Sequence, residues 1–261
     1  MSELYLGIDL GASATKAVLL NNRRQIVART AVATGLDFSR VGQEALASVL
    51  RQAGADVGHI RRAVATGYGR KNLPFPGLTK TEISCHGRGA YHYFPEAIMV
   101  VDIGGQDTKI IRLGPDGRLL DFQMNRKCAA GTGAFLEEMA RRLDLPLSEL
   151  EQLAGKSQQD VKLGSYCTVF TFTEILALSR RGIAVPDLVK ALFNAIVQRV
   201  TELGVLSGKI VATGGVVAYN PTVAGLLARS TGGELLIPPE PQLIGALGAA
   251  LFAFEEANQY A

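Results

Sequence analysis

An internal repeat limits the possible folds of this chain more than any other feature of its sequence. Residues 7–20 read GIDLGASATKAVLL, and residues 101–113 read VDIGGQDTKIIRL. Both follow the pattern Asp-x-Gly-x-x-x-Thr-Lys, and Asp9 stands 93 positions before Asp102. Each copy predicts a buried strand, a glycine-bearing turn and a second strand, which together form a β-hairpin. The repeat therefore predicts two related halves in one chain.

The two predicted turns suit a phosphate group. Glycine lets a turn come close to a ligand, and the backbone amides of such a turn can then face an anion. We expect the turns, with two side chains that follow the first of them, to contact a nucleotide. These residues are Gly11, Ala12, Ser13, Thr15 and Lys16 in the first copy and Gly104 and Gly105 in the second. Strand alternation would equally leave Lys16 and Lys109 in solvent.

Carboxylates at the strand ends predict a magnesium ion beside that phosphate. Asp9 and Asp102 each end the first strand of a hairpin, and Mg²⁺ is usually bound by one or two carboxylates with several waters. Gln106, in the second turn, has two interpretations. It orients an attacking water, as polar side chains do in other nucleotide hydrolases, or it makes a hydrogen bond within the turn. We predict Asp9, Asp102 and Gln106 as the catalytic residues.

Two further segments place small residues before a helix. KIVATGGVVAYNP, residues 209–221, predicts an apolar strand that ends at Gly214 and Gly215, a turn that would face the nucleotide. In MNRKCAAGTGAFLEEMARRL, residues 124–143, Gly131 and Thr132 precede an amphipathic helix. The first amides of a helix have no partner within it and favour anions. Gly131 and Thr132 are therefore predicted to help bind a cofactor.

Composition excludes several other classes of protein. The chain has 261 residues, is 48% hydrophobic and 20% charged, and carries a net charge of +3, which is too small to indicate nucleic acid binding. It contains no P-loop of the type GxxxxGK[ST]. The longest apolar run, residues 243–254, is too short to cross a membrane and predicts a core helix. The chain begins without the features of a signal peptide, so we predict a cytoplasmic protein.

The repeated hairpins resemble those of the actin, sugar-kinase and heat-shock-chaperone superfamily. The resemblance implies two ribonuclease-H-like α/β domains with ATP bound in a cleft between them. We expect the first domain at residues 1–95 with 241–261, and the second, carrying the cysteines, at 96–240. The expected elements are a strand meander at 4–34, a helix at 40–53, a strand at 61–66, strands at 98–103, 107–113 and 118–123, and a last helix from about Pro241.

Two cysteines stand before predicted helices. Cys128 precedes Gly131, and Cys167 precedes the helical stretch TVFTFTEILALSRRG. One chain cannot supply from these two residues the four thiolates that an iron–sulfur cluster normally takes, but two chains related by a two-fold axis can. Helix starts behind the cysteines would lower the thiol pKa and favour an anionic cluster. The alternative is that both are small buried hydrophobic residues.

Longer motifs distributed along the whole chain resemble one family. The segments ATGYGR, EISCHGRGA, DIGGQDTK, MNRKCAAGTGAFLEEMA, CTVF and GALGAAL look like those of the ATP-dependent activators of 2-hydroxyacyl-CoA dehydratases and the ATPase subunits of benzoyl-CoA reductase. The resemblance implies a homodimer that holds one 4Fe–4S cluster between its subunits, through Cys128 and Cys167 of each. It also implies ATP, ADP and Mg²⁺ as ligands, a ferredoxin or flavodoxin as upstream donor, and transfer of one low-potential electron to a partner iron–sulfur enzyme.

One position departs from the family pattern. After CTVF the activators read AESEV, whereas this chain reads TFTEI, so Phe172 replaces the first glutamate and Glu174 matches the second. Glu174 is predicted to contact the cofactor. The alternatives are an amino-sugar type kinase of the same superfamily, for which Asp107 is the nearest carboxylate base, and a nucleotide switch without redox chemistry.

The remaining cysteine and the histidines have simpler interpretations. Cys85 has no partner cysteine and is predicted to lie in the core. His59, His86 and His92 lack the spacing of metal ligands, so surface or packing roles are expected for them.

Overall fold

The computed structural model describes residues 3–73, 75–125, 127–164 and 167–258, which fall into two compact units. The first unit comprises Met1–Ala97, Arg112–Leu120 and Gln242–Ala261, and the second comprises Ile98–Ile111 and Asp121–Pro241. The domain limits expected from the sequence, 1–95 with 241–261 and 96–240, stay a prediction. They did not anticipate that Arg112–Leu120, around the turn after the second hairpin, groups with the first unit.

The first unit is built on a five-stranded mixed sheet in the order β3-β2-β1-β4-β5. Strands β1 and β2 form the first predicted hairpin, β3 continues it antiparallel, and β4 and β5 add parallel strands. The strands are β1 (Leu4–Leu10), β2 (Ala14–Leu20), β3 (Ile26–Ala33), β4 (Ile60–Thr66) and β5 (Leu78–Thr79). All seven residues of β1 are buried, as expected of a central strand covered on both faces.

The second unit repeats this order with its own sheet, β10-β9-β6-β7-β8. Strand β9 pairs in parallel with β6 and with β10, as β4 pairs with β1 and β5. The strands are β6 (Ile98–Ile103), β7 (Thr108–Leu113), β8 (Leu119–Asn125), β9 (Lys209–Thr213) and β10 (Glu234–Leu236). The predicted meander and the four predicted single strands are confirmed, the latter within two residues at each end. The repeat in the sequence is therefore a repeat of topology.

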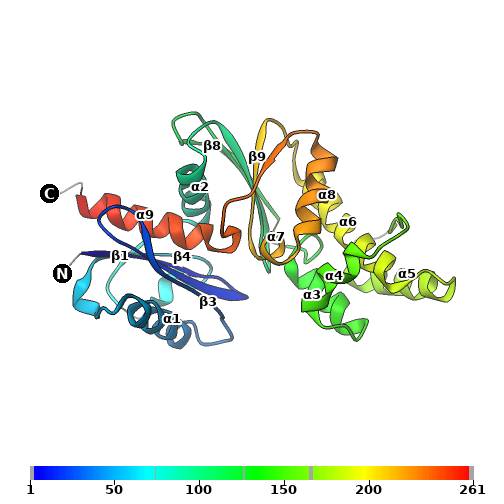
Figure 1. Ribbon diagram of the computed structural model, residues 1–261, viewed down its shortest axis with the longest axis horizontal. Helices are drawn as coiled ribbons and strands as arrows, with labels where there is room; N and C mark the ends of the chain where they lie inside the picture. The colour runs from blue at the N-terminus through cyan, green and yellow to red at the C-terminus, as the bar shows by residue number, and fades with distance from the viewer. Residues whose placement is uncertain (1–2, 74, 126, 165–166, 259–261) are drawn as a thin grey trace. The chain divides into compact units, whose positions relative to one another are not determined.

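Each unit also contains the helices that pack with its sheet or connect its strands. Figure 1 shows α1 and α9 on opposite faces of the first sheet. The first unit contains α1 (Phe38–Ala53), α2 (Glu82–Tyr93) and α9 (Ile244–Asn258), and the second contains α3 (Gly133–Arg142), α4 (Leu150–Gly155), α5 (Thr168–Arg180), α6 (Val185–Leu203), α7 (Gly215–Tyr219) and α8 (Pro221–Thr231). Short 3₁₀ turns cover Val57–His59, Arg70–Asn72, Leu147–Glu149 and Pro241–Leu243. The predicted core helix is therefore α9.

Helix α9 packs unusually closely on its neighbours because glycines remove side chains at the contacts. A Cβ atom at Gly7 of β1 would meet the backbone of Ala246 and Ala250. A Cβ atom at Gly248 would overlap the carbonyl oxygen of Cys85 in α2, and one at Gly89 would overlap that of Ile244. Only glycine permits backbones to approach this closely. These contacts fix α2 and α9 beside the end of β1, where Asp9 lies.

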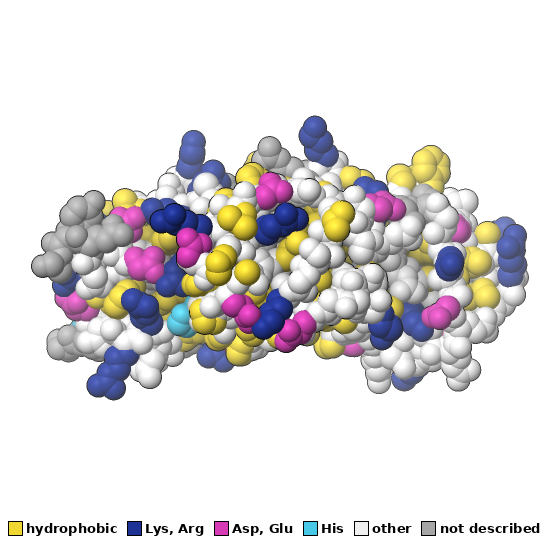
Figure 2. All heavy atoms as spheres, turned by 90° about the horizontal axis from the view of Figure 1, so that it is seen from above, with side chains coloured by type: hydrophobic (Ala, Val, Ile, Leu, Met, Phe, Trp, Pro, Cys, Tyr) yellow, Lys and Arg dark blue, Asp and Glu magenta, His cyan; other side chains and the backbone are white. Residues whose placement is uncertain are grey.

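The surface is mixed in charge. On the face drawn in Figure 2, basic and acidic side chains of the described residues are interspersed, in keeping with the small net charge. Within the part of the chain that the structure describes, none of the helices has the length and apolar character needed to span a membrane.

Candidate functional site

The first predicted aspartate, Asp9, is buried at the end of β1 and paired with a lysine. Lys16 lies directly opposite Asp9 in the hairpin register, and its Nζ donates to Asp9 Oδ2 at 3.1 Å. A buried carboxylate requires such a partner because desolvation would otherwise penalise its charge. The solvated alternative for Lys16 is therefore wrong, because its ammonium group is held by the aspartate it was expected to accompany.

The first glycine turn is supported from beneath by two buried threonines. The Thr34 hydroxyl donates to the Gly11 carbonyl at 2.7 Å and lies 2.9 Å from the Thr15 hydroxyl, and the Thr34 amide donates to the Ser13 carbonyl. Thr15 is fully buried, so its hydroxyl supports the turn from inside the fold. The exposed tip of the turn is Ala12. The turn is thus fixed in shape by the protein itself.

The second predicted aspartate, Asp102, has partners on both oxygens. Thr213 at the end of β9 donates its hydroxyl to Oδ1 at 2.9 Å, and Lys109 donates to Oδ2 at 3.3 Å. Lys109 also reaches Asp107 Oδ1 at 2.5 Å and is itself only 2% exposed. Lys109 is therefore not solvated either. Asp107, which the kinase alternative would use as a base, is held by this lysine.

The second glycine turn is hydrogen-bonded to the segment that carries Cys128. Gly133 and Ala134, the first two residues of α3, donate their amides to the carbonyls of Gly104 at 2.9 Å and Gly105 at 2.7 Å. The prediction that the first amides of this helix face an anion is wrong for these two residues, because the turn already accepts from them. Gln106 lies exposed at the turn. Turn and helix start form one hydrogen-bonded unit.

The loop before α3 exposes Cys128 and buries Ala130 and Thr132 after it. Cys128 is exposed, and Asn125 at the end of β8 donates to its carbonyl and to that of Ala130, both at 3.1 Å. Thr132 is fully buried, with its hydroxyl on the Ala129 carbonyl at 2.6 Å. Thr108 of the hairpin donates to the carbonyl of Gly131 at 2.6 Å, which anchors the loop to β7.

The second cysteine is exposed and lies at a helix start, as predicted. Cys167 is the N-cap residue of α5, and hydrogen bonds from the backbone of Phe170 and Val169 hold the pKa of its thiol below the usual value. Thiolate is the form that binds metal ions. Cys85, in contrast, is buried in the core, as predicted, and burial raises the pKa of its thiol to about 12.

The residues of the TFTEI segment stabilise this region. Glu174 accepts the amide of Gly164 at 2.7 Å, so it fixes the loop that leads to Cys167. The Arg142 guanidinium of α3 stacks 5.1 Å from the ring centre of Phe172 in α5, a cation–π contact. Phe172 therefore joins the two helices that follow the cysteines, although the family glutamate is absent.

One repeated motif was missed in the sequence. Residues 65–67 and 212–214 both read ATG, at the ends of the equivalent strands β4 and β9. In the second copy Thr213 binds Asp102. Gly67 and Gly214 have φ of +91° and +96° and lie against the backbone of the aspartate-bearing strand, so each needs glycine. Aligning these two short segments would have found both threonines.

Two sheets of the same order, each with a glycine turn and a buried Asp–Lys pair, define a nucleotide-binding protein of the actin and sugar-kinase fold. Solved structures agree with this fold: the chain matches a ROK family glucokinase from Streptomyces griseus with TM-score 0.60, 15% identity, and coverage of 97% of this chain and 99% of that one. The expected fold class is confirmed. At this identity the likeness concerns the fold alone.

The chain belongs to the BadF/BadG/BcrA/BcrD ATPase family, whose model matches residues 6–253. It is 38% identical to a 2-hydroxyisocaproyl-CoA dehydratase activator of Clostridioides difficile over 97% of this chain and 96% of the relative. It is 40% identical to an activator of lactoyl-CoA dehydratase of Anaerotignum propionicum over 97% and 98%. A structure of the Clostridium difficile activator with bound ADPNP matches with TM-score 0.91 and 38% identity, covering 100% and 97%. The family resemblance seen in the sequence is confirmed, and the chain is an ATPase by family.

Proposed function

We propose that this ATPase is an electron donor that activates an iron–sulfur enzyme of the 2-hydroxyacyl-CoA dehydratase or related reductase type. Its named relatives, which it matches over nearly their whole length, are dehydratase activators. The observation that carries the proposal is the pair of hydrogen bonds from Gly133 and Ala134 to the turn at Gly104 and Gly105. A change at a bound phosphate would act on that turn and so on the loop of Cys128.

The cysteines fit a bridging 4Fe–4S cluster. Cys128 and Cys167 are both exposed and both lie in the second unit, and α3 and α5, which follow them, pack together. Such a cluster takes four thiolates, so two copies of this chain would supply two each. When bound, the cluster would carry one electron at low potential. The lowered pKa of Cys167 favours the thiolate that this site requires.

The hairpins supply the nucleotide chemistry. Asp9 and Asp102, each fixed by a lysine, are proposed to orient the waters of a magnesium ion carried by ATP. The turns at residues 11–13 and 104–106 would contact the phosphates, with the Gly104 amide already donating to the Asp107 carbonyl at 2.9 Å, and the exposed Gln106 would orient the attacking water. A ferredoxin or flavodoxin is the proposed upstream donor, and the cytoplasm, where thiols stay reduced, the proposed location.

The kinase alternative is less well supported. It requires a carboxylate that is available to take a proton from an acceptor hydroxyl, whereas Asp107 is engaged by Lys109 at 2.5 Å. The kinase likeness is limited to the fold at 15% identity. A kinase or a simple nucleotide switch also has no need of two exposed thiols.

Iron analysis of the anaerobically purified protein tests the proposal. We expect a brown homodimer with about four irons per dimer, the content of one 4Fe–4S cluster, and a visible absorbance that bleaches when dithionite and ATP are added. Metal analysis, absorbance and light scattering on one preparation provide the three readouts. An iron-free, colourless ATPase after cluster reconstitution would contradict the electron-donor function and leave the nucleotide switch.

A further inference from the structure

A buried histidine borders the aspartate of the first hairpin. His86 of α2 is 6% exposed and Asp9 is 4% exposed. A Cβ atom built on Gly245, in the first turn of α9, would lie 2.7 Å from His86 Nε2 and 3.2 Å from Asp9 Oδ2. The ring nitrogen and the carboxylate oxygen therefore face the same point, and only a glycine at position 245 leaves that point empty.

The glycine contacts of α9 bring these three residues together. Gly7 lets α9 rest on β1, two residues before Asp9, and Gly248 lets α2 approach α9 at Cys85, one residue before His86. Fully buried polar side chains are normally hydrogen-bonded. The glycines thus leave a buried imidazole and a buried carboxylate beside the same point of α9, which indicates a specific role for the ring.

The hydrogen-bond partners of Asp102 in the second unit show which partner Asp9 lacks in the first. There Asp102 is held on one oxygen by Lys109 and on the other by Thr213. In the first unit Lys16 corresponds to Lys109, but the hydroxyl of Thr66, which corresponds to Thr213, is buried and makes no hydrogen bond with the described residues. A second side chain to orient Asp9 must therefore come from elsewhere.

We propose that His86 is a positioning residue for Asp9, with Nε2 donating to Oδ2 and thereby fixing the carboxylate together with Lys16. The inference rests on the proposed role of Asp9 at the magnesium–phosphate group. A carboxylate held by two donors keeps its remaining lone pairs in one direction. The waters of a bound magnesium ion could then donate to it without any rotation of the Asp9 side chain. Partners of this kind typically change metal affinity or activity 10- to 100-fold when they are removed.

Two substitutions at His86 separate positioning from packing. Glutamine places an amide nitrogen where histidine has Nε2, whereas asparagine places one where histidine has Nδ1. We expect His86→Asn to lower kcat/KM for ATP hydrolysis by about 10-fold or more and to raise the Mg²⁺ concentration for half-maximal rate by a similar factor. His86→Gln is expected to restore both to within about 3-fold. Steady-state ATPase assays with magnesium titration give both quantities.

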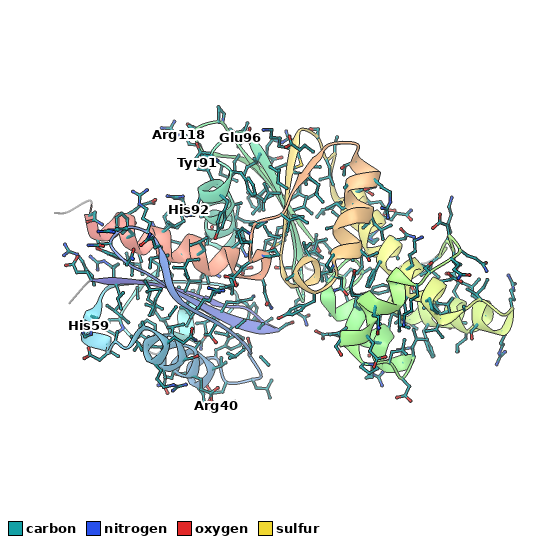
Figure 3. All side chains as sticks on the ribbon, in the orientation of Figure 1. Arg40, His59, Tyr91, His92, Glu96 and Arg118 are labelled. Carbon is teal, nitrogen blue, oxygen red and sulfur yellow. The ribbon has the colours of Figure 1, made fainter. Side chains whose placement is uncertain are left out.

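Gly245→Ala tests the same contact from the other side. Its methyl group would stand between His86 and Asp9, so we expect the same loss of kcat/KM and the same magnesium shift as in His86→Asn. Gly225→Ala in α8 is the matched control, because its added atom would have only Arg229 nearby at 3.8 Å. His92→Asn, six residues further along α2 and labelled in Figure 3, controls for histidine loss on the same helix. Both controls should keep wild-type kinetics.

Asp9→Asn is the reference variant that separates the positioning role of His86 from the proposed role of Asp9 itself. If Asp9→Asn loses hydrolysis while His86→Asn and Gly245→Ala keep wild-type kinetics, the positioning role of His86 is wrong and the assignment of Asp9 stands. If Asp9→Asn also keeps wild-type kinetics, the assignment of Asp9 itself is wrong. A defect of equal size in His86→Gln and His86→Asn would mean that the ring serves packing alone, and would overturn the proposal.

Discussion

Replacing either Cys128 or Cys167 with serine is expected to remove the iron from the dimer while nucleotide binding persists. If the proposed cluster is shared by two chains, each substitution deletes one ligand from each chain, so two of its four ligands disappear. A serine hydroxyl is far less acidic than a thiol and does not replace it as a ligand for iron. We expect iron to fall from about four per dimer to less than about 0.5, an almost complete loss.

Nucleotide binding should survive because the thiols lie outside the hairpins that contain Asp9 and Asp102. Calorimetric titration with ADP is expected to detect binding in both serine variants, with a Kd that differs from the wild-type value only by the coupling between the two sites. The matched control is Cys85→Ala, which removes the buried thiol and should keep the iron. A preparation of either serine variant that retained about four irons and the wild-type absorbance would refute the assignment of Cys128 and Cys167.

The second large effect is expected at the aspartates of the two hairpins. Asp9→Asn and Asp102→Asn should each lower the rate of ATP hydrolysis by about 10² to 10³, the scale on which removal of one preorganised electrostatic group acts. The side-chain amide of asparagine keeps the shape of the carboxylate but lacks the negative charge that is proposed to orient the magnesium waters. The iron content and absorbance should be unchanged in both variants.

The two substitutions should differ in their effect on folding stability. Asp102→Asn leaves Lys109 with Asp107 as a carboxylate partner, whereas Asp9→Asn takes from Lys16 the only carboxylate for which the described residues show a contact. We expect Asp9→Asn to lower the free energy of unfolding more, by about 1–3 kcal/mol, because it leaves a partly buried charge uncompensated. Asp116→Asn at the exposed turn before β8 is the control. Wild-type ATPase activity in both hairpin variants would show that the hairpins do not organise the magnesium–phosphate group.

The topology could be predicted because the sequence repeats it. Two hairpins with the same residue pattern require the same local geometry, and the buried strands β1 and β6 are apolar runs interrupted only by Asp9 and Asp102. The close approach of α9 to β1 and α2 was not predictable in the same way. The segment GALGAAL indicates a buried helix, but only the three-dimensional structure shows that Gly245 faces His86 and Gly248 faces Cys85.

The sequence indicates the candidate site residues, which stay a prediction, but not the contacts that these residues make. Asp9, Asp102 and the cysteines follow from the repeat and from family motifs. That Lys16 and Lys109 bind the aspartates depends on cross-strand register, which alternation alone does not define. That Gly133 donates to Gly104 depends on a contact between segments about 30 residues apart in the chain. Such contacts arise from tertiary packing, for which local sequence carries no signal.

In the proposed function, the nucleotide state at the hairpins acts on a cluster bound by Cys128 and Cys167. Because the turn at Gly104 and Gly105 is bonded to the start of α3, a nucleotide that prefers one arrangement of the turn must also shift the loop of Cys128. By linkage, the two sites then change each other's affinity.

Iron removal by a chelator, followed through the visible absorbance with ATP, with ADP and without nucleotide, measures this coupling directly. We predict clearly different rates in the ATP and ADP states, with the more open state losing iron faster. The iron-free protein is expected to dissociate toward monomer, because the proposed shared site would be part of the subunit contact. Equal rates in all three conditions, from a dimer that stays intact without iron, would show that nucleotide state and cluster are not coupled.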